Sequence, residues 1–308
     1  MMSGHSRLRA VGVLAVTALF ATTACGAAAT GSDAPAEGTP QVLAAFYPLQ
    51  WLTEQVGGPD VTVTSLTAAG VEPHDLELGV PQMAQLEDAT LTVYIKGVQP
   101  AVDEAVTPDR AFDAATAIAT LPSGAPAGGH AEGEAGHEVP YDTHLWLDPA
   151  RFATVATELG ERLAAADPAH AQAYKERAGR TATSLSTLDQ DFARGLADCS
   201  TKTMVTAHEA FGYLADRYQL KQVGITLDPE TEPSPARIAE VARLAKAEKV
   251  TTVFTESLVS PKVAEVLASE VGARTVVLDP LESKPAGDYL SGMRSNLRTL
   301  RTALGCTS

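Results

Sequence analysis

From residue 41 onward, short segments rich in Val, Thr and Ile alternate with segments whose apolar residues recur at helical spacing. We expect strands at residues 42–46, 61–66, 91–95, 203–206, 251–255 and 275–278. Helices are expected at residues 48–56, 81–88, 209–218, 235–248 and 261–271, several with Pro in the first turn. Such alternation predicts parallel sheets covered by helices. Ligands of such sheets bind in the crevice beyond the carboxyl ends of the strands.

The alternation is interrupted once, after the segment Leu147-Asp148-Pro149, by two long apolar stripes. The second stripe predicts a helix of about 30 residues, which at 1.5 Å per residue is about 45 Å long and can run along two lobes. A chain of 308 residues is also long for a single hydrophobic core. We therefore predict an N-terminal α/β lobe at residues 41–167, a linking helix at 168–198 and a C-terminal α/β lobe at 199–308.

The N-terminus has the composition of an export signal. Residues 1–24 carry Arg7 and Arg9 without any acidic residue, followed by an apolar run at 11–21 that is too short to span a bilayer. The alternative for this run is a buried helix. Residues 22–26, TTACG, resemble a lipoprotein cleavage box with Thr22 in place of the usual Leu, so Cys25 is the predicted lipidation site. Residues 25–40 are expected to be a flexible tether, which places the folded body at the outer face of the cell membrane.

Three further features of the sequence concern its partners and its covalent structure: the net charge, two cysteines and one low-complexity loop. The formal net charge of −15 repels phosphate backbones and argues against nucleic acid as a partner. Cys199 and Cys306 are the only cysteines besides Cys25, and in an oxidising compartment we expect them to form a disulfide, the alternative being two free thiols. The Pro- and Gly-rich loop at residues 122–140 contains His130 and His137, which either collect metal weakly or belong to a plain solvated loop.

Three histidines and one aspartate occur in loops next to predicted strands or element starts. They are His74, His144, His208 and Asp279. Each of them alone is more often a structural residue. Together, imidazole nitrogens and one carboxylate oxygen form a four-ligand set that suits zinc. With two ligands from each lobe, the ion would join the lobes across the cleft.

Six runs of sequence resemble, in order and position, the zinc-receptor (ZnuA-like) branch of the metal-specific solute-binding proteins of bacterial ABC importers. The runs are GVEPHDLE, DTHLWLDP, TAHEAFGYLADRY, GITLDPETEPSPARIAEV, ESLVSPKVAEVLA and VVLDPL. The resemblance implies two α/β lobes joined by a long helix, with the metal between them. It also implies His74, His144, His208 and Asp279 as ligands, an ABC permease in the membrane as partner, and a monomeric receptor.

The third ligand position distinguishes between metals. Manganese receptors of this family typically have Glu where this chain has His208, and imidazole suits zinc better than manganese. Zinc is therefore the expected cargo, with manganese as the alternative, and ligand type leaves copper and nickel open. Glu72, Glu209 and Glu256 lie near the ligand motifs and either support the site or are surface acids.

A secreted zinc hydrolase and a surface adhesin are the alternative classes of function. A zinc hydrolase would need an open coordination position and a general base such as Glu209. However, Gly212 stands where a second histidine of the zincin motif would be, and neither a nucleophile elbow nor a P-loop occurs. An additional role as a surface adhesin stays open.

Overall fold

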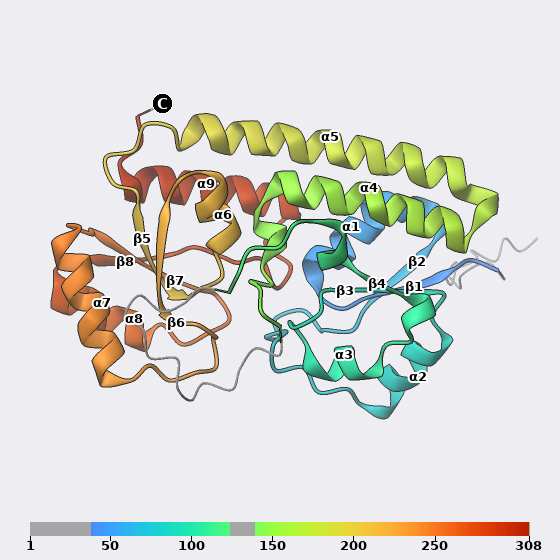
Figure 1. Cartoon of the computed structure of the whole chain (residues 1–308), viewed down its shortest axis with the longest axis horizontal. Coiled ribbons are helices and arrows are strands. Elements are labelled where there is room, and N and C mark those ends of the chain that lie inside the picture. The colour runs from blue at the N-terminus through green and yellow to red at the C-terminus, as the bar shows by residue number, and fades with distance from the viewer. Residues whose placement is uncertain (1–37, 124–138, 308) are drawn as a thin grey trace, which may run out of the picture. The chain divides into compact units, whose positions relative to one another are not determined.

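Two parallel four-stranded sheets form the framework of the computed structural model, which describes residues 38–123 and 139–307 (Figure 1). The described residues belong to one compact unit. The first sheet has the strand order β2-β1-β3-β4, and the second has the order β6-β5-β7-β8. The prediction of parallel α/β sheets in two lobes is confirmed.

In the first sheet, Val42 of β1 lies opposite Val63 of β2 and Leu91 of β3, so apolar residues pair across the centre of the sheet. The second sheet is built in the same way, with Val205 of β5 opposite Val223 of β6 and Val253 of β7. The first sheet comprises β1 (Gln41–Ala44), β2 (Thr62–Ser65), β3 (Leu91–Tyr94) and β4 (Ala111–Asp113). The second comprises β5 (Thr203–His208), β6 (Lys221–Thr226), β7 (Thr252–Thr255) and β8 (Arg274–Val277).

Helices connect the parallel strands of each sheet, as crossover geometry requires. The first lobe contains α1 (Tyr47–Gly57), α2 (Val80–Asp88) and α3 (Pro100–Ala105), with short 3₁₀ turns η1 (Gly58–Asp60), η2 (Pro108–Arg110), η3 (Ala114–Ala117) and η4 (Leu145–Leu147). The second lobe contains α6 (Gly212–Arg217), α7 (Pro235–Ala247), α8 (Lys262–Val271) and α9 (Tyr289–Leu304).

Two antiparallel helices, α4 (Pro149–Ala166) and α5 (Ala171–Gly195), lie side by side over the first lobe, and α5 continues along the second lobe (Figure 1). The 25 residues of α5 span about 38 Å, and the helix contacts α1 in the first lobe and α9 in the second. It is shorter than the predicted range 168–198, because residues 168–170 form the separate 3₁₀ turn η5 (Pro168–His170). The Arg177 side chain ties α5 to the first lobe by donating to the carbonyls of Val56 and Gly57.

The lobes share one hydrophobic core in which aromatic rings from both meet. Tyr289 of α9 stacks on Trp51 of α1, with ring centroids 4.7 Å apart, and lies 5.2 Å from Phe152 of α4. The Tyr289 hydroxyl donates to the main-chain oxygen of Trp146. Because these rings are buried, the two sheets are held together by dry packing as well as by the chain connection.

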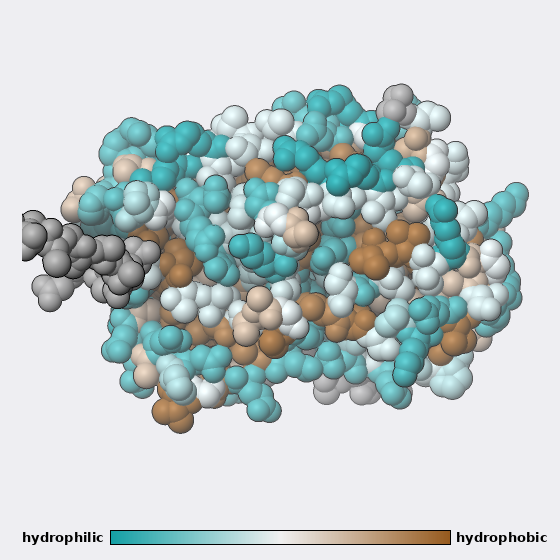
Figure 2. Space-filling model, turned by 180° about the vertical axis from the view of Figure 1, so that it is seen from behind, coloured by the Kyte–Doolittle hydropathy of each residue, from teal (hydrophilic) through white to brown (hydrophobic). Residues whose placement is uncertain are grey.

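A disulfide joins Cys199, just after α5, to Cys306, just after α9. It pins the C-terminal end of the described chain to the start of the second sheet. The face shown in Figure 2 is mostly hydrophilic or neutral, with separate hydrophobic patches. Among the described residues, no helix combines the length and apolar character needed to cross a membrane.

Candidate metal centre

The second sheet places two side chains of the site at the ends of neighbouring strands. His208 is the last residue of β5, and Glu256 directly follows β7. The strand order of the sheet reverses between β5 and β7, and crevices open at such positions beyond the carboxyl ends of the strands. His208 is completely buried there, and its main-chain N–H donates to Glu256 Oε1 at 3.1 Å.

The first lobe contributes two histidines from irregular segments. His74 lies in the loop between β2 and α2, where its main-chain N–H donates to Glu72 Oε1 at 3.3 Å. His144 directly precedes η4, and its main-chain N–H donates to Asp142 Oδ1 at 2.9 Å. In both cases a carboxylate two residues earlier in the chain fixes the backbone of the histidine.

Four side chains converge between the two sheets. Their potential ligand atoms all lie within 4.8 Å of one another, and the residues are His74, His144, His208 and Glu282. The Nε2 atoms of His144 and His208 are 3.3 Å apart. Glu282 Oε1 lies 3.6 Å from His74 Nε2, 3.7 Å from His144 Nε2 and 3.9 Å from His208 Nε2.

These separations fit a tetrahedral zinc ion. With Zn–N distances of about 2.0–2.1 Å, tetrahedral geometry places neighbouring ligand atoms about 3.3–3.4 Å apart. The described cluster needs only small side-chain movements to reach that spacing. Three of its buried atoms, His74 Nε2, His208 Nδ1 and Glu282 Oε1, have no hydrogen-bond partner among the described residues, and the first and last of these face one another. A cation at the centre would satisfy both.

Buried carboxylates and imidazoles in and beside the cluster shift one another's pKa values. Burial opposes ionisation of Glu282, but the three histidines lower its pKa to about 2. Burial also opposes protonation of His208, but Glu256 and Glu282 raise its pKa to about 9. Burial and the nearby Glu282 raise the pKa of Glu72 to about 8. Without a metal ion, the site therefore holds protons at neutral pH.

Carboxylates behind the cluster orient two of the imidazoles. Glu256 Oε2 lies 2.7 Å from His208 Nδ1, and Asp142 Oδ1 lies 2.8 Å from His144 Nδ1. Both contacts engage Nδ1, and the two Nε2 atoms lie 3.3 Å from each other on the side of the other ligand groups. Carboxylates that fix the tautomer and ring orientation in this way are common around protein-bound zinc.

The structure does not bring Asp279 into the cluster. Its Oδ1 accepts the main-chain N–H of Leu281 at 2.8 Å, so the carboxylate closes a turn, and Glu282, three residues later, takes the place expected for Asp279. Both acids follow β8 in the same loop. Both acids lie in the loop that the sequence indicated, and that loop contains no local signal that separates the turn residue from the residue that faces the histidines.

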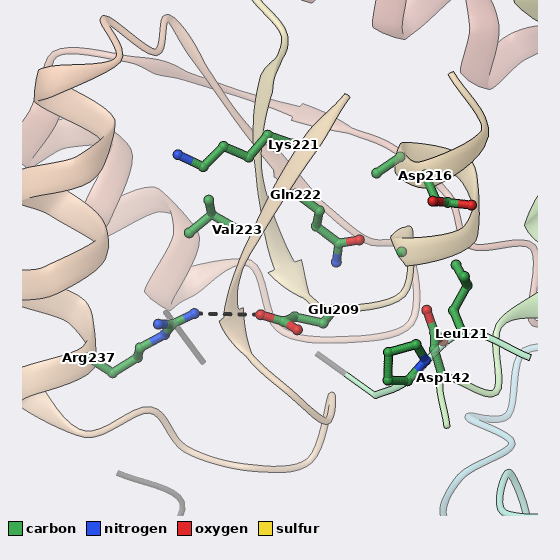
Figure 3. A pocket seen from close by; sticks show the side chains of 11 residues that line it. Leu121, Asp142, Glu209, Asp216, Lys221, Gln222, Val223 and Arg237 are labelled. Atoms are coloured by element: carbon green, nitrogen blue, oxygen red, sulfur yellow. Dashed lines mark ion pairs between the residues drawn. The ribbon is translucent and has the colours of Figure 1, made fainter. Parts of the chain in front are cut away.

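Among the other predicted residues, Glu209 lies outside the cluster. Its carboxylate points toward Arg237 of α7, 3.6 Å away, inside a neighbouring pocket (Figure 3). Asp142 also borders that pocket. Glu72 lies next to the cluster, where its Oε1 accepts the main-chain N–H of His74 at 3.3 Å. His130 and His137, like Cys25 and the predicted export signal, lie outside the described residues.

A small cavity of about 60 Å³ reaches the cluster from one side. Its lining includes His144, Tyr141 and Asp142 from the first lobe and Glu209 and Leu227 from the second. Residues of both lobes therefore border the cluster of three histidines and Glu282. His144 is the member of the cluster that faces this cavity.

The family model that matches this chain and two of its relatives are described as zinc-uptake or zinc-binding proteins. The model of the family described as zinc-uptake complex component A, periplasmic (ZnuA), matches residues 42–303. The zinc-binding lipoprotein AdcA of Streptococcus pneumoniae is 33% identical over 289 residues, which cover 89% of this chain and 57% of the relative. The chain thus spans little more than half the length of that relative. The high-affinity zinc uptake system protein ZnuA of Bacillus subtilis is 32% identical, with 95% of this chain and 97% of the relative covered.

Solved structures show the same architecture. The Zn(II)-bound ZnuA-like domain of Streptococcus pneumoniae AdcA has a TM-score of 0.72 at 31% identity, covering 87% of this chain and 99% of that one. The laminin-binding protein Lmb of Streptococcus agalactiae, described as bifunctional with adhesin and metal-transporting activity, has a TM-score of 0.75 at 30% identity and covers 86% of this chain and 99% of its own.

Proposed function

Because the chain belongs to the family of the zinc-uptake complex component A (ZnuA), we propose that it is an extracytoplasmic receptor that captures Zn²⁺ and delivers it to an ABC importer permease. We propose His74, His144, His208 and Glu282 as the ligands. The observation that carries the proposal is the convergence of three imidazole nitrogens and one carboxylate oxygen within 4.8 Å. The family is a component of zinc uptake, not an enzyme.

The donor set favours zinc over manganese as cargo. Three nitrogen donors and one oxygen donor match the preference of zinc, whereas manganese prefers carboxylate and water oxygens. Four protein ligands would also leave no open position for a catalytic water, which argues against the hydrolase alternative. The site therefore suits holding and releasing an ion.

The experiment that tests the proposal is a competitive titration of residues 36–308, the compact unit of the fold, with zinc and manganese by calorimetry. We expect one zinc per chain, bound more tightly than manganese, and severe loss of binding in His74→Ala, His144→Ala, His208→Ala and Glu282→Ala. Zinc binding that survives all four changes would remove this site from the proposal. A further variant, His208→Glu, should weaken zinc relative to manganese.

The position of the receptor in the cell is proposed from the sequence. Residues 1–24 would be the export signal, Cys25 the lipidated first residue of the mature protein, and residues 25–40 the tether to the outer face of the membrane. Mass spectrometry of the N-terminal peptide tests this directly. Cys25→Ala should release an unmodified protein from the membrane fraction, and a wild-type peptide without lipid would contradict the anchor.

A second role as an adhesin is favoured by one comparison. Lmb is described as a bifunctional protein with adhesin and metal-transporting activity, and it is 30% identical to this chain. Saturable binding of the purified protein to immobilised laminin, with an unrelated acidic protein as control, would support this role. Binding no stronger than that of the control would exclude it.

A further inference from the structure

We propose that Asp279 is a positioning residue, which fixes the turn from which Glu282 reaches the three histidines. The inference rests on the proposed function, because it concerns the fourth ligand of the same zinc site. The sequence indicated Asp279 as a ligand. We assign its carboxylate a different role, which is to hold the backbone of the loop between β8 and α9.

The turn contains an unusual backbone conformation directly before Glu282. Leu281 has a φ of 60°, in the left-handed region that residues with a branched side chain rarely adopt. Asp279 Oδ1 accepts the Leu281 N–H at 2.8 Å. The Leu281 side chain is buried against Gly292 of α9, where an added Cβ would come within 2.7 Å of Leu281 Cδ2. The conformation is therefore held at both the backbone and the side chain.

Asp279 is itself fixed to α9 by a buried amide. Asn296 Oδ1 accepts the main-chain N–H of Asp279 at 3.2 Å, and Asn296 Nδ2 donates to the Asp279 carbonyl at 2.6 Å. The side chain of Asn296 is almost fully buried. Asp279 thus connects a rigid helix to the turn, with its own backbone held on one side and its carboxylate holding Leu281 on the other.

The same loop is joined to the segments that carry two of the histidines. The indole N–H of Trp146, two residues after His144, donates to the Pro280 carbonyl at 2.7 Å. The main-chain N–H of Gly70, in the loop that leads to His74, donates to Ser283 Oγ at 2.7 Å. These contacts flank Leu281 and Glu282, so the conformation of Leu281 decides where the Glu282 carboxylate lies relative to the histidines.

Among the described residues, the hydrogen bonds of the Asp279 carboxylate are with the turn and with Ser257, not with the three histidines. One oxygen is occupied by the Leu281 N–H, and the other lies 3.5 Å from the hydroxyl of Ser257. The groups whose ligand atoms gather within 4.8 Å include Glu282 and not Asp279. Preorganisation of a ligand by such a neighbour typically changes metal affinity 10–100-fold.

The test is a double-mutant cycle on residues 36–308, with zinc affinity measured by competition against a chromogenic chelator. We expect Asp279→Ala to weaken zinc binding by about 10–100-fold. Asp279→Asn keeps an oxygen that can accept the Leu281 N–H and should stay close to the parent. In a Glu282→Ala background, Asp279→Ala should cause no further loss, because the group that it positions is absent.

Two comparisons separate positioning from general damage. Asp288→Ala is the matched control, because Asp288 lies in the same loop and accepts a main-chain N–H, that of Ser291, away from the turn; its zinc affinity should remain that of the parent. Asn296→Ala should weaken zinc binding, and this effect should also vanish in the Glu282→Ala background. The visible spectrum of the Co²⁺-loaded Asp279→Ala protein should change, since it reports coordination geometry.

Equal losses in Asp279→Asn and Asp279→Ala, additive with Glu282→Ala, would mean that Asp279 binds zinc itself and would overturn the inference. Unchanged affinity in Asp279→Ala would overturn it as well. A parent protein that binds no zinc would instead refute the proposed function, and the inference with it.

Discussion

Glu256 lies next to His208, a proposed zinc ligand that is completely buried. Glu256 Oε2 lies 2.7 Å from His208 Nδ1 and thereby directs Nε2 to the centre of the cluster. We expect Glu256→Ala to weaken zinc binding by about 10–100-fold, because the ring loses its preferred tautomer and orientation. Isothermal titration with zinc measures this effect.

Glu209 provides the matched control for that variant. It is the neighbour of His208 in the chain, but it is not a member of the cluster, and its carboxylate lies 3.6 Å from Arg237 (Figure 3). Glu209→Gln should therefore leave zinc affinity close to that of the parent. Equal losses in both variants would show that the negative charge near β5 matters, and not the orientation of His208.

The site is expected to exchange protons for zinc. The pKa of His208 is raised to about 9 and that of Glu72 to about 8, so both hold protons at pH 7 in the metal-free protein. Zinc requires a neutral imidazole. Apparent zinc affinity should therefore keep rising with pH up to about 9, beyond the usual histidine value of about 6.5. Calorimetry at pH 7 in buffers of different ionisation enthalpy should show proton release, and its absence would contradict the raised pKa values.

The same groups make the stability of the metal-free protein depend on pH. Protonated His208 is favoured in the folded state, because its pKa there lies above the unfolded value of about 6.5. That stabilisation is fully present below pH 6.5 and is lost as the pH rises through about 9. Urea unfolding in the presence of a chelator should show a lower midpoint at pH 9 than at pH 6, and the zinc-loaded protein should not follow this trend.

At the scale of elements, the disulfide between Cys199 and Cys306 closes a loop with a sequence separation of 107 residues. In the chain-entropy model, a loop of that length contributes about 4–5 kcal/mol to the free energy of unfolding, less any strain. We expect the double variant Cys199→Ser/Cys306→Ser to unfold at lower urea concentration while its zinc affinity is unchanged. A loss of zinc affinity would instead link the disulfide to the geometry of the site.

Most elements could be predicted from apolar periodicity, and two strands could not. The predicted strands at residues 42–46 and 91–95 correspond to β1 and β3, and both segments, VLAAF and LTVYI, consist mainly of apolar residues. The strand β4 was missed because it has only three residues. The strand β6 was missed because its sequence KQVGIT mixes Lys, Gln and Gly with few apolar residues; pairing with β5 stabilises it, and tertiary pairing is not visible in a local pattern.

The site residues could also be predicted only in part, because local sequence motifs indicate some of them and tertiary contacts decide the others. Three histidines next to element ends could be identified from their motifs, and the structure brings them together. The choice between Asp279 and Glu282 depends on the left-handed conformation of Leu281 and on contacts from Trp146 and Asn296. Those partners lie far away in the sequence or on a different element, so inspection of the loop alone favoured the first carboxylate after the strand.

At the scale of the whole described unit, a long helix and a buried aromatic core join the two sheets. The helix α5 contacts both lobes, and the buried rings of Trp51, Phe152 and Tyr289 form a continuous core between them. Separating the lobes would expose these rings to water. We therefore expect zinc to act by local ordering of the ligand loops, without wide opening and closing of the lobes.

Small-angle X-ray scattering of the metal-free and zinc-loaded protein measures this directly. The radius of gyration should be the same in both states within experimental error. Hydrogen exchange should slow on zinc binding in the loops around His74 and Glu282, and much less in α5. A clear decrease in the radius of gyration on loading would contradict the shared core as the restraint on the lobes.

The position of Trp146 gives the molecule an internal optical sensor. Only two tryptophans occur in the chain; Trp146 is fully buried, and its ring centroid lies 5.2 Å from that of His144. When zinc binds beside His144, the charge next to this indole changes while the indole itself stays buried. Its emission should therefore report metal loading without any label, and Trp51, packed in the aromatic core, supplies a constant background within the same spectrum.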